Sequence, residues 1–431
     1  MSKLISELGI NSPLQTALNE LEITVATDIQ EQIIPFILNQ EEDVVALAKT
    51  GTGKTAAFGL PLLQLVDVEN DTIQTLILAP TRELSQQIYN NLIAFSKQLP
   101  KISIALVTGG APIKTQMEEL QSPTHIIVAT PGRFLDLLEK NSLDVNSLKN
   151  LVLDEADEMF QALKDNLLLI IKALPKKRRT LLFSATMPGE LKDLVHNYMS
   201  KNVVSVDSSM ATLGHEGIDH QYMVVEPIEK LDVLLHFLNT QEGGRGIIFC
   251  KTKAAVNKLT KNLAKCKISS GALHGSLSQG IRDRIMGQFR EGHIDILVAT
   301  DLVARGIDVK ELSFIVNYHL PDTHDAYVHR SGRTGRAGAK GLSMTILQKE
   351  EVEEIAGFEE ALGIHFKAID KANAEDIEWN NAVVWAKKIV KTKPNRQIPE
   401  EVKQQVKTIL HQLTKEELID KVLSNYWREN S

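Results

Sequence analysis

The sequence predicts two α/β domains, each built on a parallel sheet, followed by a helical tail. Short runs rich in Val, Ile and Leu alternate with amphipathic segments, as expected for buried parallel strands separated by helices. The alternation stops at residues 208–218 and then resumes, and after residue 366 the pattern is helical with no further strands. We therefore expect domains at 1–207 and 219–366, a linker at 208–218 and a helical extension at 367–431.

The candidate strands are apolar on both faces, which predicts a doubly wound sheet with helices on both sides. In the first domain they lie at 43–48, 75–80, 103–109, 125–130, 150–155 and 179–186. The helix-like segments between them include 82–98, 113–121 and 187–199. In the second domain the candidate strands lie at 246–251, 293–300, 314–321 and 341–347.

The composition is that of a globular protein able to bury large cores. The chain has 431 residues, of which 43% are hydrophobic and 24% charged. We expect no membrane span and no secretory leader, because no apolar run is long enough. Cys250 and Cys266 are the only cysteines, so we expect no disulfide framework and a reducing, cytoplasmic location. The net charge of −7 argues only weakly against nucleic-acid binding, because it does not show where the charges lie.

A glycine-rich loop, AKTGTGKT at 48–55, joins a predicted strand to a helix-like run. A phosphate-binding loop needs this context, since backbone N–H groups at a helix N-terminus can surround phosphate oxygens. Lys54 could reach the β- and γ-phosphates, and the Thr55 hydroxyl could ligate Mg²⁺. Ala48 stands where the general pattern has Gly. The alternative, a plain glycine-rich turn, is disfavoured by the strand before the loop and the helix after it.

The stretch LVLDEADEMF at 151–160 ends an apolar run in four carboxylates, Asp154, Glu155, Asp157 and Glu158. Phosphate-loop enzymes place an Asp at the end of a second strand, where it helps to hold Mg²⁺. Asp154 fits that role, and Glu155 could orient or deprotonate the attacking water. The alternative is the solvated acidic first turn of a helix, which we retain for Glu158.

The tetrapeptide Asp154-Glu155-Ala156-Asp157 closely resembles the signature of the DEAD-box ATP-dependent RNA helicases, and the resemblance extends from about residue 5 to 366. Further family motifs occur in the family's order: PTREL (80–84), GG (109–110), TPGR (130–133), SAT (184–186), ATDLVARGID (299–308) and HRSGRTGR (329–336). The resemblance implies two tandem RecA-like domains, with ATP and Mg²⁺ as cofactors and RNA as the partner.

The resemblance also implies a role for each matching position. Gln30 would read the edge of adenine and Asp308 would contact the ribose. The implied ATP contacts are Ile23, Thr27, Gln30, Ala48, Lys49, Thr50, Gly51, Thr52, Gly53, Lys54, Thr55 and Asp308. The implied catalytic residues are Lys54, Asp154, Glu155, His329, Arg333 and Arg336, with Thr55 and Asp154 at the metal. Asp157, Ser184 and Thr186 would couple the ATP site to closure of the domains.

RNA contacts follow from the resemblance in the same way. They are Arg82, Gly110, Thr130 and Arg133 on the first domain and Gln279, Arg282, Thr300 and Arg305 on the second. Hydroxyls, backbone amides and Arg side chains suit phosphate contacts, which carry no sequence information. The implied activity is RNA-stimulated ATP hydrolysis with local unwinding of short duplexes or remodelling of RNA–protein complexes. Two alternatives remain. One is an ATP-gated RNA clamp with little unwinding, and the other is a DNA motor, although the sequence has no additional segments for processive translocation or for engaging double strands.

The sequence departs from the family at the adenine site. An aromatic residue usually stacks on adenine just before the glutamine motif, but Ile23 lies there, and Ile5 replaces a second upstream aromatic. Because an aliphatic side chain lacks the aromatic stacking energy, we expect weak ATP affinity in the absence of RNA.

The helical tail leaves two interpretations open. The window 379–399 combines Trp379 and Trp385 with cations and no acids, which suits either RNA binding or packing, and packing is favoured. Thr414 and Glu417 form a capping-box pattern before an amphipathic stretch with Ile419, Leu423 and Trp427 on one stripe. This stretch could dock a protein partner or dimerise.

Overall fold

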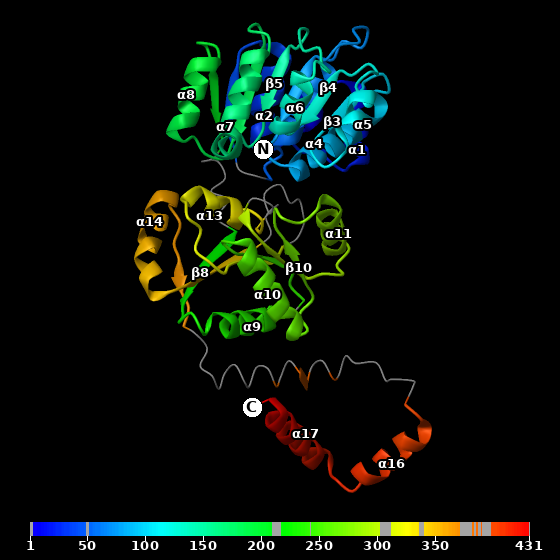
Figure 1. Cartoon of the computed structure of the whole chain (residues 1–431), viewed down its shortest axis with the longest axis vertical. Helices are drawn as coiled ribbons and strands as arrows, with labels where there is room; N and C mark the ends of the chain where they lie inside the picture. Colours follow the sequence, from blue (N-terminus) through cyan, green and yellow to red (C-terminus); the bar gives the residue numbers. More distant parts are fainter. Residues whose placement is uncertain are drawn as a thin grey trace.

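The computed structural model describes residues 3–48, 51–208, 217–241, 243–301, 312–335, 340–370 and 398–426. It also describes residues 382, 385, 386 and 389, and the helical backbone of 427–430. Figure 1 shows the first domain at the top, the second domain in the middle and the helical tail below them. The structure confirms the predicted fold class of two parallel-sheet α/β domains with a helical C-terminal region.

The first domain contains a parallel sheet with the strand order β3-β4-β2-β5-β6-β1-β7. Its strands are β1 Val44–Leu47, β2 Thr75–Leu78, β3 Ile104–Val107, β4 Ile126–Ala129, β5 Asn150–Leu153, β6 Arg179–Ser184 and β7 Val204–Asp207. Its helices are α1 Ser12–Glu20, α2 Asp28–Asn39, α3 Lys54–Gln64, α4 Arg82–Phe95, α5 Ile113–Glu119, α6 Pro131–Glu139, α7 Ala156–Ala173 and α8 Gly189–Tyr198, with a short 3₁₀ helix, η1, at Ile5–Leu8.

Helices cover both faces of this sheet, as the doubly apolar strands predict. Val44 and Ala46 of β1 belong to one buried cluster, together with apolar residues of α2, α3 and α4. Val45 belongs to the cluster on the other face, with apolar residues of α6, α7 and α8. Successive strand residues point to opposite faces, so an unbroken apolar run serves both cores.

The second domain repeats the architecture with the strand order β10-β11-β9-β12-β13-β8-β14, again parallel throughout. Its strands are β8 Ile218–Val224, β9 Gly246–Phe249, β10 Ser270–Leu273, β11 Ile296–Ala299, β12 Phe314–Asn317, β13 Gly341–Leu347 and β14 Lys367–Ala368. Its described helices include α9 Lys230–Thr240, α10 Lys253–Lys265, α11 Gln279–Arg290, α13 His324–Ser331 and α14 Val352–Leu362.

The strands that the sequence did not predict lie at or next to the sheet edges. They are β7, β8, β10 and β14. β7 and β8 alternate between buried and exposed residues, and β10 is built from the small-residue run SGAL. Neither pattern resembles a doubly buried strand. The expectation of no strand after residue 366 is wrong, because β14 pairs with β8 through Lys367 and Ala368.

The tail contains α16 Glu400–Leu410 and α17 Lys415–Asn430. The predicted capping box is present: Glu417 accepts from the Thr414 backbone N–H at 2.8 Å, and the Glu417 N–H donates to the Thr414 hydroxyl at 3.2 Å. The ring of Trp385 lies 4.6 Å from that of Tyr426 on α17, which agrees with packing of Trp385. Trp379 lies outside the described residues. Among the helices that the structure describes, none is long and apolar enough to cross a membrane.

Candidate active site

The glycine-rich loop lies at the carboxyl end of β1, where it turns directly into α3. Gly51 and Gly53 have φ of 83° and 87°, a left-handed conformation that glycine adopts without strain. Lys54 begins α3 and is buried, and its Nζ donates to the Ala48 carbonyl at 3.1 Å. The loop therefore holds a lysine ammonium beside a helix N-terminus, which is a phosphate-binding arrangement. Lys49 and Thr50 lie outside the described residues.

Gln30 is fixed against this loop. Its Nε2 donates to the Gly53 carbonyl at 3.2 Å, and its Oε1 accepts from the Thr27 N–H at 3.0 Å. A Cβ on Gly53 would displace the Gln30 amide, and the left-handed φ strains any other residue, so this position favours glycine. Ile23 is partly buried and packs against the first-domain core, whereas Ile5 is fully buried in that core.

Asp154 and Lys54 form the charged centre of the site. Asp154 directly follows β5 and is only 2% exposed, and its Oδ1 lies 3.9 Å from Lys54 Nζ. Burial raises the pKa of Asp154 to about 6, although Lys54 opposes the shift. Glu155 follows in a left-handed conformation, φ 52° and ψ 54°, which is strained for a residue with a side chain. Its Oε2 is buried and has no hydrogen-bond partner within the part of the chain that the structure describes.

These residues fit a divalent cation. Asp154 and Thr55 could supply oxygen atoms, which Mg²⁺ prefers, and Lys54 compensates the buried Asp154 carboxylate only in part, since burial still raises its pKa. Within the described ranges, no group of three or more His, Cys, Asp and Glu side chains is arranged to hold a metal. A cation at Asp154 would therefore also need phosphate and water oxygens, as is usual for Mg²⁺.

Asp157, Ser184 and Thr186 form one hydrogen-bonded network between α7 and the end of β6. Asp157 Oδ2 accepts from the Thr186 N–H at 3.0 Å and from its hydroxyl at 2.8 Å. Ser184 Oγ accepts from the Asp157 N–H at 3.3 Å and donates to the Thr186 carbonyl at 2.7 Å. The structure thus brings together the three residues that the resemblance groups as coupling residues.

His329 reaches this network from the second domain. Its Nε2 lies 3.8 Å from Asp157 Oδ2 and 3.2 Å from Glu158 Oε1. Arg333 lies one turn beyond His329, and its Nε donates to the His329 carbonyl at 3.2 Å. The expectation that Glu158 is solvated is wrong, because Glu158 is 3% exposed at the boundary between the domains. The helix pattern correctly placed Glu158 in a first turn, but it could not indicate that the second domain covers that turn.

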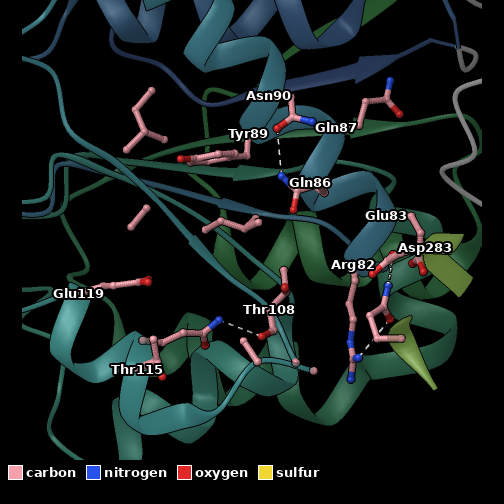
Figure 2. A pocket seen from close by; sticks show the side chains of 18 of the residues that line it. Arg82, Glu83, Gln86, Gln87, Tyr89, Asn90, Thr108, Thr115, Glu119 and Asp283 are labelled. Atoms are coloured by element: carbon pink, nitrogen blue, oxygen red, sulfur yellow. Dashed lines mark hydrogen bonds between the residues drawn. The ribbon is translucent and has the colours of Figure 1, made fainter. Parts of the chain in front are cut away.

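Six of the eight residues implied in RNA binding line two hollows at the boundary between the domains, and Arg82 lines both. One is lined by Thr130, Arg133, Gly275 and Arg282, among others. Figure 2 shows the other, which follows α4 past Gln86 and Asn90 and reaches Asp283 of the second domain. Arg82 donates to Gln279 Oε1 at 3.2 Å across the domains. A Cβ on Gly110 would lie 2.6 Å from Arg82 Nη1, so this arginine lies directly against the glycine pair.

The remaining predicted residues divide into those that are placed and those that are not. Arg133 is anchored by the Ala111 carbonyl at 3.0 Å and Gln116 Oε1 at 2.8 Å, and Thr300 follows β11. Arg305, Asp308 and Arg336 lie outside the described residues.

Sequence reasoning missed two charged pairs that position the site. Arg282 binds Glu83 across the domains at 2.8 Å, and Arg330 binds Asp301 within the second domain at 2.5 and 2.7 Å. Glu83, Asp301 and Arg330 lie in motifs that the sequence does reveal, and Arg282 is one of the implied RNA contacts. Their pairing could not be inferred, because it depends on which motifs meet in space.

A phosphate-binding loop, an acidic strand end and a histidine–arginine pair from the second domain define the class: an ATPase with two tandem RecA-like domains. Comparison with protein families gives the family. The DEAD/DEAH box helicase model matches residues 27–194, and the helicase conserved C-terminal domain matches 229–338. A model described as the helical domain of a probable ATP-dependent RNA helicase matches 377–426. The chain belongs to the DEAD-box family of ATP-dependent RNA helicases, which hydrolyse ATP.

Curated relatives agree with this assignment. The chain is 39% identical to ATP-dependent RNA helicase CshA of Limosilactobacillus reuteri, over 86% of this chain and 74% of the relative. It is 38% identical to ATP-dependent RNA helicase DbpA of Bacillus subtilis, over 85% and 76% respectively.

Solved structures with the same two-domain arrangement include helicases bound to RNA. S. cerevisiae Dbp5 bound to RNA and ADP BeF3 is 31% identical, with a TM-score of 0.79, and the match covers 89% of this chain and all of that one. Mss116p bound to ssRNA and AMP-PNP is 26% identical, with a TM-score of 0.79, over 89% and 82%.

Proposed function

We propose that this helicase couples ATP hydrolysis to closure of its two domains on RNA, and that closure separates short duplexes locally. The single observation that carries the proposal is the contact of His329 with Asp157 and Glu158, at 3.8 and 3.2 Å. Asp157 belongs to the first-domain network with Ser184 and Thr186, so the network can sense whether the second domain is in place.

In this proposal, the first domain binds the nucleotide. Lys54 holds the phosphates, Gln30 and Thr27 recognise adenine, and Thr55 and Asp154 hold Mg²⁺. Mg²⁺ held by these two residues would neutralise negative charge on the phosphates. Glu155, whose Oε2 is buried without a partner among the described residues, orients and deprotonates the attacking water.

The second domain completes the site only when the domains are closed. Arg333 approaches the phosphates from that domain, and a finger of this kind contributes about 10³–10⁵ in rate in related systems. Its dependence on closure explains why the ATPase would respond to RNA. The RNA backbone would lie along Arg82, Gly110, Thr130 and Arg133 on one side and Gln279, Arg282 and Thr300 on the other.

The test measures the ATPase rate with single-stranded RNA, with single-stranded DNA and without nucleic acid, together with unwinding of a short RNA duplex. We expect stimulation by RNA and ATP-dependent strand separation. Equal stimulation by DNA would contradict RNA as the substrate. RNA-stimulated hydrolysis without strand separation would favour the ATP-gated clamp instead.

A further inference from the structure

Glu158 is a buried carboxylate that is assigned no role above in ATP binding, hydrolysis or RNA binding. It lies in the first turn of α7, and only 3% of the residue is exposed. Acidic residues are favourable in a first turn because the helix dipole is positive there, but that effect does not require burial. A buried carboxylate is expensive unless a cation or hydrogen-bond donors compensate it. The position of Glu158 therefore calls for a positive group nearby.

That group is His329 of the second domain. The distance from its Nε2 to Glu158 Oε1 is 3.2 Å, shorter than the 3.8 Å to Asp157 Oδ2. Asp157 Oδ2 already accepts two hydrogen bonds from Thr186, inside the first domain. Glu158 is therefore the nearer carboxylate for the histidine, and the contact exists only while the two domains are together.

The surroundings of His329 favour its protonated form. Burial opposes the positive charge, but the nearby carboxylates of Asp157, Glu158 and Glu155 outweigh it and raise the pKa of His329. In return, despite its burial, the pKa of Asp157 is lowered by His329, Thr186 and Lys54. The groups that face the imidazole from α7 and its N-cap are thus three carboxylates, and Lys54 from α3 is the cation that acts on the same cluster.

His329 and Arg333 are also linked to each other. His329 lies in the last turn of α13, Arg333 lies two residues beyond the helix, and the Arg333 Nε donates to the His329 carbonyl at 3.2 Å. A carboxylate that holds the imidazole therefore helps to hold the arginine finger, without touching the nucleotide itself.

We propose that Glu158 is a positioning residue of the ATPase, whose carboxylate holds the His329 imidazolium at the closed domain boundary, so that closure binds a proton. The inference rests on the closure mechanism proposed above. Closure is then favoured below the pKa that His329 has in the closed state, and the advantage is lost as the pH rises through that value. Glu158 extends the active range toward alkaline pH.

The experiment compares wild type with Glu158→Gln across pH 6–9, with RNA saturating and the RNA-stimulated ATPase as readout. The amide keeps the size of the side chain but removes its charge. We expect the alkaline limb of the pH profile to move down by about one pH unit. At pH 8 the stimulated rate should fall about tenfold, while at pH 6 it should stay within about threefold of wild type.

The matched control is Glu83→Gln, which neutralises a different carboxylate at the same domain boundary. Glu83 pairs with Arg282 rather than with His329, so the pH profile of this variant should keep the wild-type shape after scaling. Glu158→Asp, which keeps the charge, should restore most of the alkaline limb. With His329→Gln as the background, Glu158→Gln should produce no further shift.

Two outcomes would overturn the inference. One is a Glu158→Gln profile that superimposes on wild type after scaling. The other is a shift that persists in the His329→Gln background. If Glu158→Gln fails to fold, Glu158→Asp still tests the inference. A folded Glu158→Asp variant that loses activity at alkaline pH would contradict a role for the carboxylate charge. A wild-type enzyme without RNA stimulation would instead refute the closure mechanism itself, so the two failures are distinguishable.

Discussion

Glu83 of the first domain and Arg282 of the second form an ion pair across the domain boundary, with Arg282 Nη1 2.8 Å from Glu83 Oε1. Their side chains are 15% and 13% exposed, so solvent screens the pair only partly. The neighbouring contact of Arg82 with Gln279 crosses the same boundary. Arg82, Gln279 and Arg282, which the family resemblance implies as RNA contacts, therefore also join the two domains directly.

The first prediction concerns this pair. Glu83→Gln and Arg282→Gln should each raise the RNA concentration needed for half-maximal ATPase stimulation by about tenfold, because the closed state loses a partly buried ion pair. The double variant should lose little more than the worse single variant, since the pair is already broken. Fully additive losses in such a double-mutant cycle would show that the two residues act separately.

The second prediction concerns the water-activating group. Glu155→Gln should bind ATP as wild type does but hydrolyse it about 10²–10⁴-fold more slowly, since a positioned general base contributes that much. Single-turnover hydrolysis and a nucleotide-binding titration separate the two effects. Full turnover in this variant would remove Glu155 from the mechanism.

The third prediction links catalysis to stability. Burial raises the pKa of Asp154 from 3.8 to about 6, so the folded state binds this proton more tightly than the unfolded chain. Ionisation of Asp154 therefore lowers the free energy of unfolding as the pH rises from about 4 to about 6. The loss, roughly 2–3 kcal/mol, persists at neutral pH. Asp154→Asn should raise the melting temperature at pH 7.5 without nucleotide or Mg²⁺, while abolishing hydrolysis.

Thermal unfolding at pH 4 is the internal control for Asp154→Asn. There the wild-type carboxyl is largely protonated in the folded state, so the gain in melting temperature should shrink. An equal gain at both pH values would mean that the asparagine stabilises by packing rather than by removing a charge.

The fourth prediction concerns the phosphate-binding loop. Gly53→Ala should weaken ATP binding by at least about tenfold, because the left-handed φ of 87° strains a residue with a Cβ and the added Cβ would displace the Gln30 amide. Gly189→Ala is the matched control, since a Cβ there has no atom within 4 Å. Titration with a fluorescent ATP analogue compares the two, and the control should bind like wild type.

The fifth prediction concerns the adenine site. Ile23→Phe should tighten RNA-free ATP binding by about 0.5–1.5 kcal/mol, the energy of an aromatic contact beyond area burial. Ile23→Leu keeps the aliphatic character and should change the affinity little. Tight, low-micromolar binding by the wild type without RNA would contradict the expectation that Ile23 weakens the site.

Much of the molecule follows from local patterns. The apolar strands at 43–48 and 150–155 end at the glycine-rich loop and at Asp154, and the carboxyl ends of parallel strands lie at one edge of a sheet. That relationship brings Lys54 within 3.9 Å of Asp154, although 100 residues separate them. The resemblance supplied the roles of Gln30, Ser184 and His329, and the structure brings Ser184 and His329 to the DEAD tetrapeptide.

The sequence by itself therefore determined the two parallel sheets, the family and the residues at each strand end, because strand burial and loop chemistry are local properties. Only the tertiary structure decided what meets across the domains. Glu158 looked like a solvated helix start and is buried beneath His329, and Glu83 looked unremarkable and pairs with Arg282. Periodicity records which face of an element is buried, but it cannot record a partner that a separate domain brings to that face.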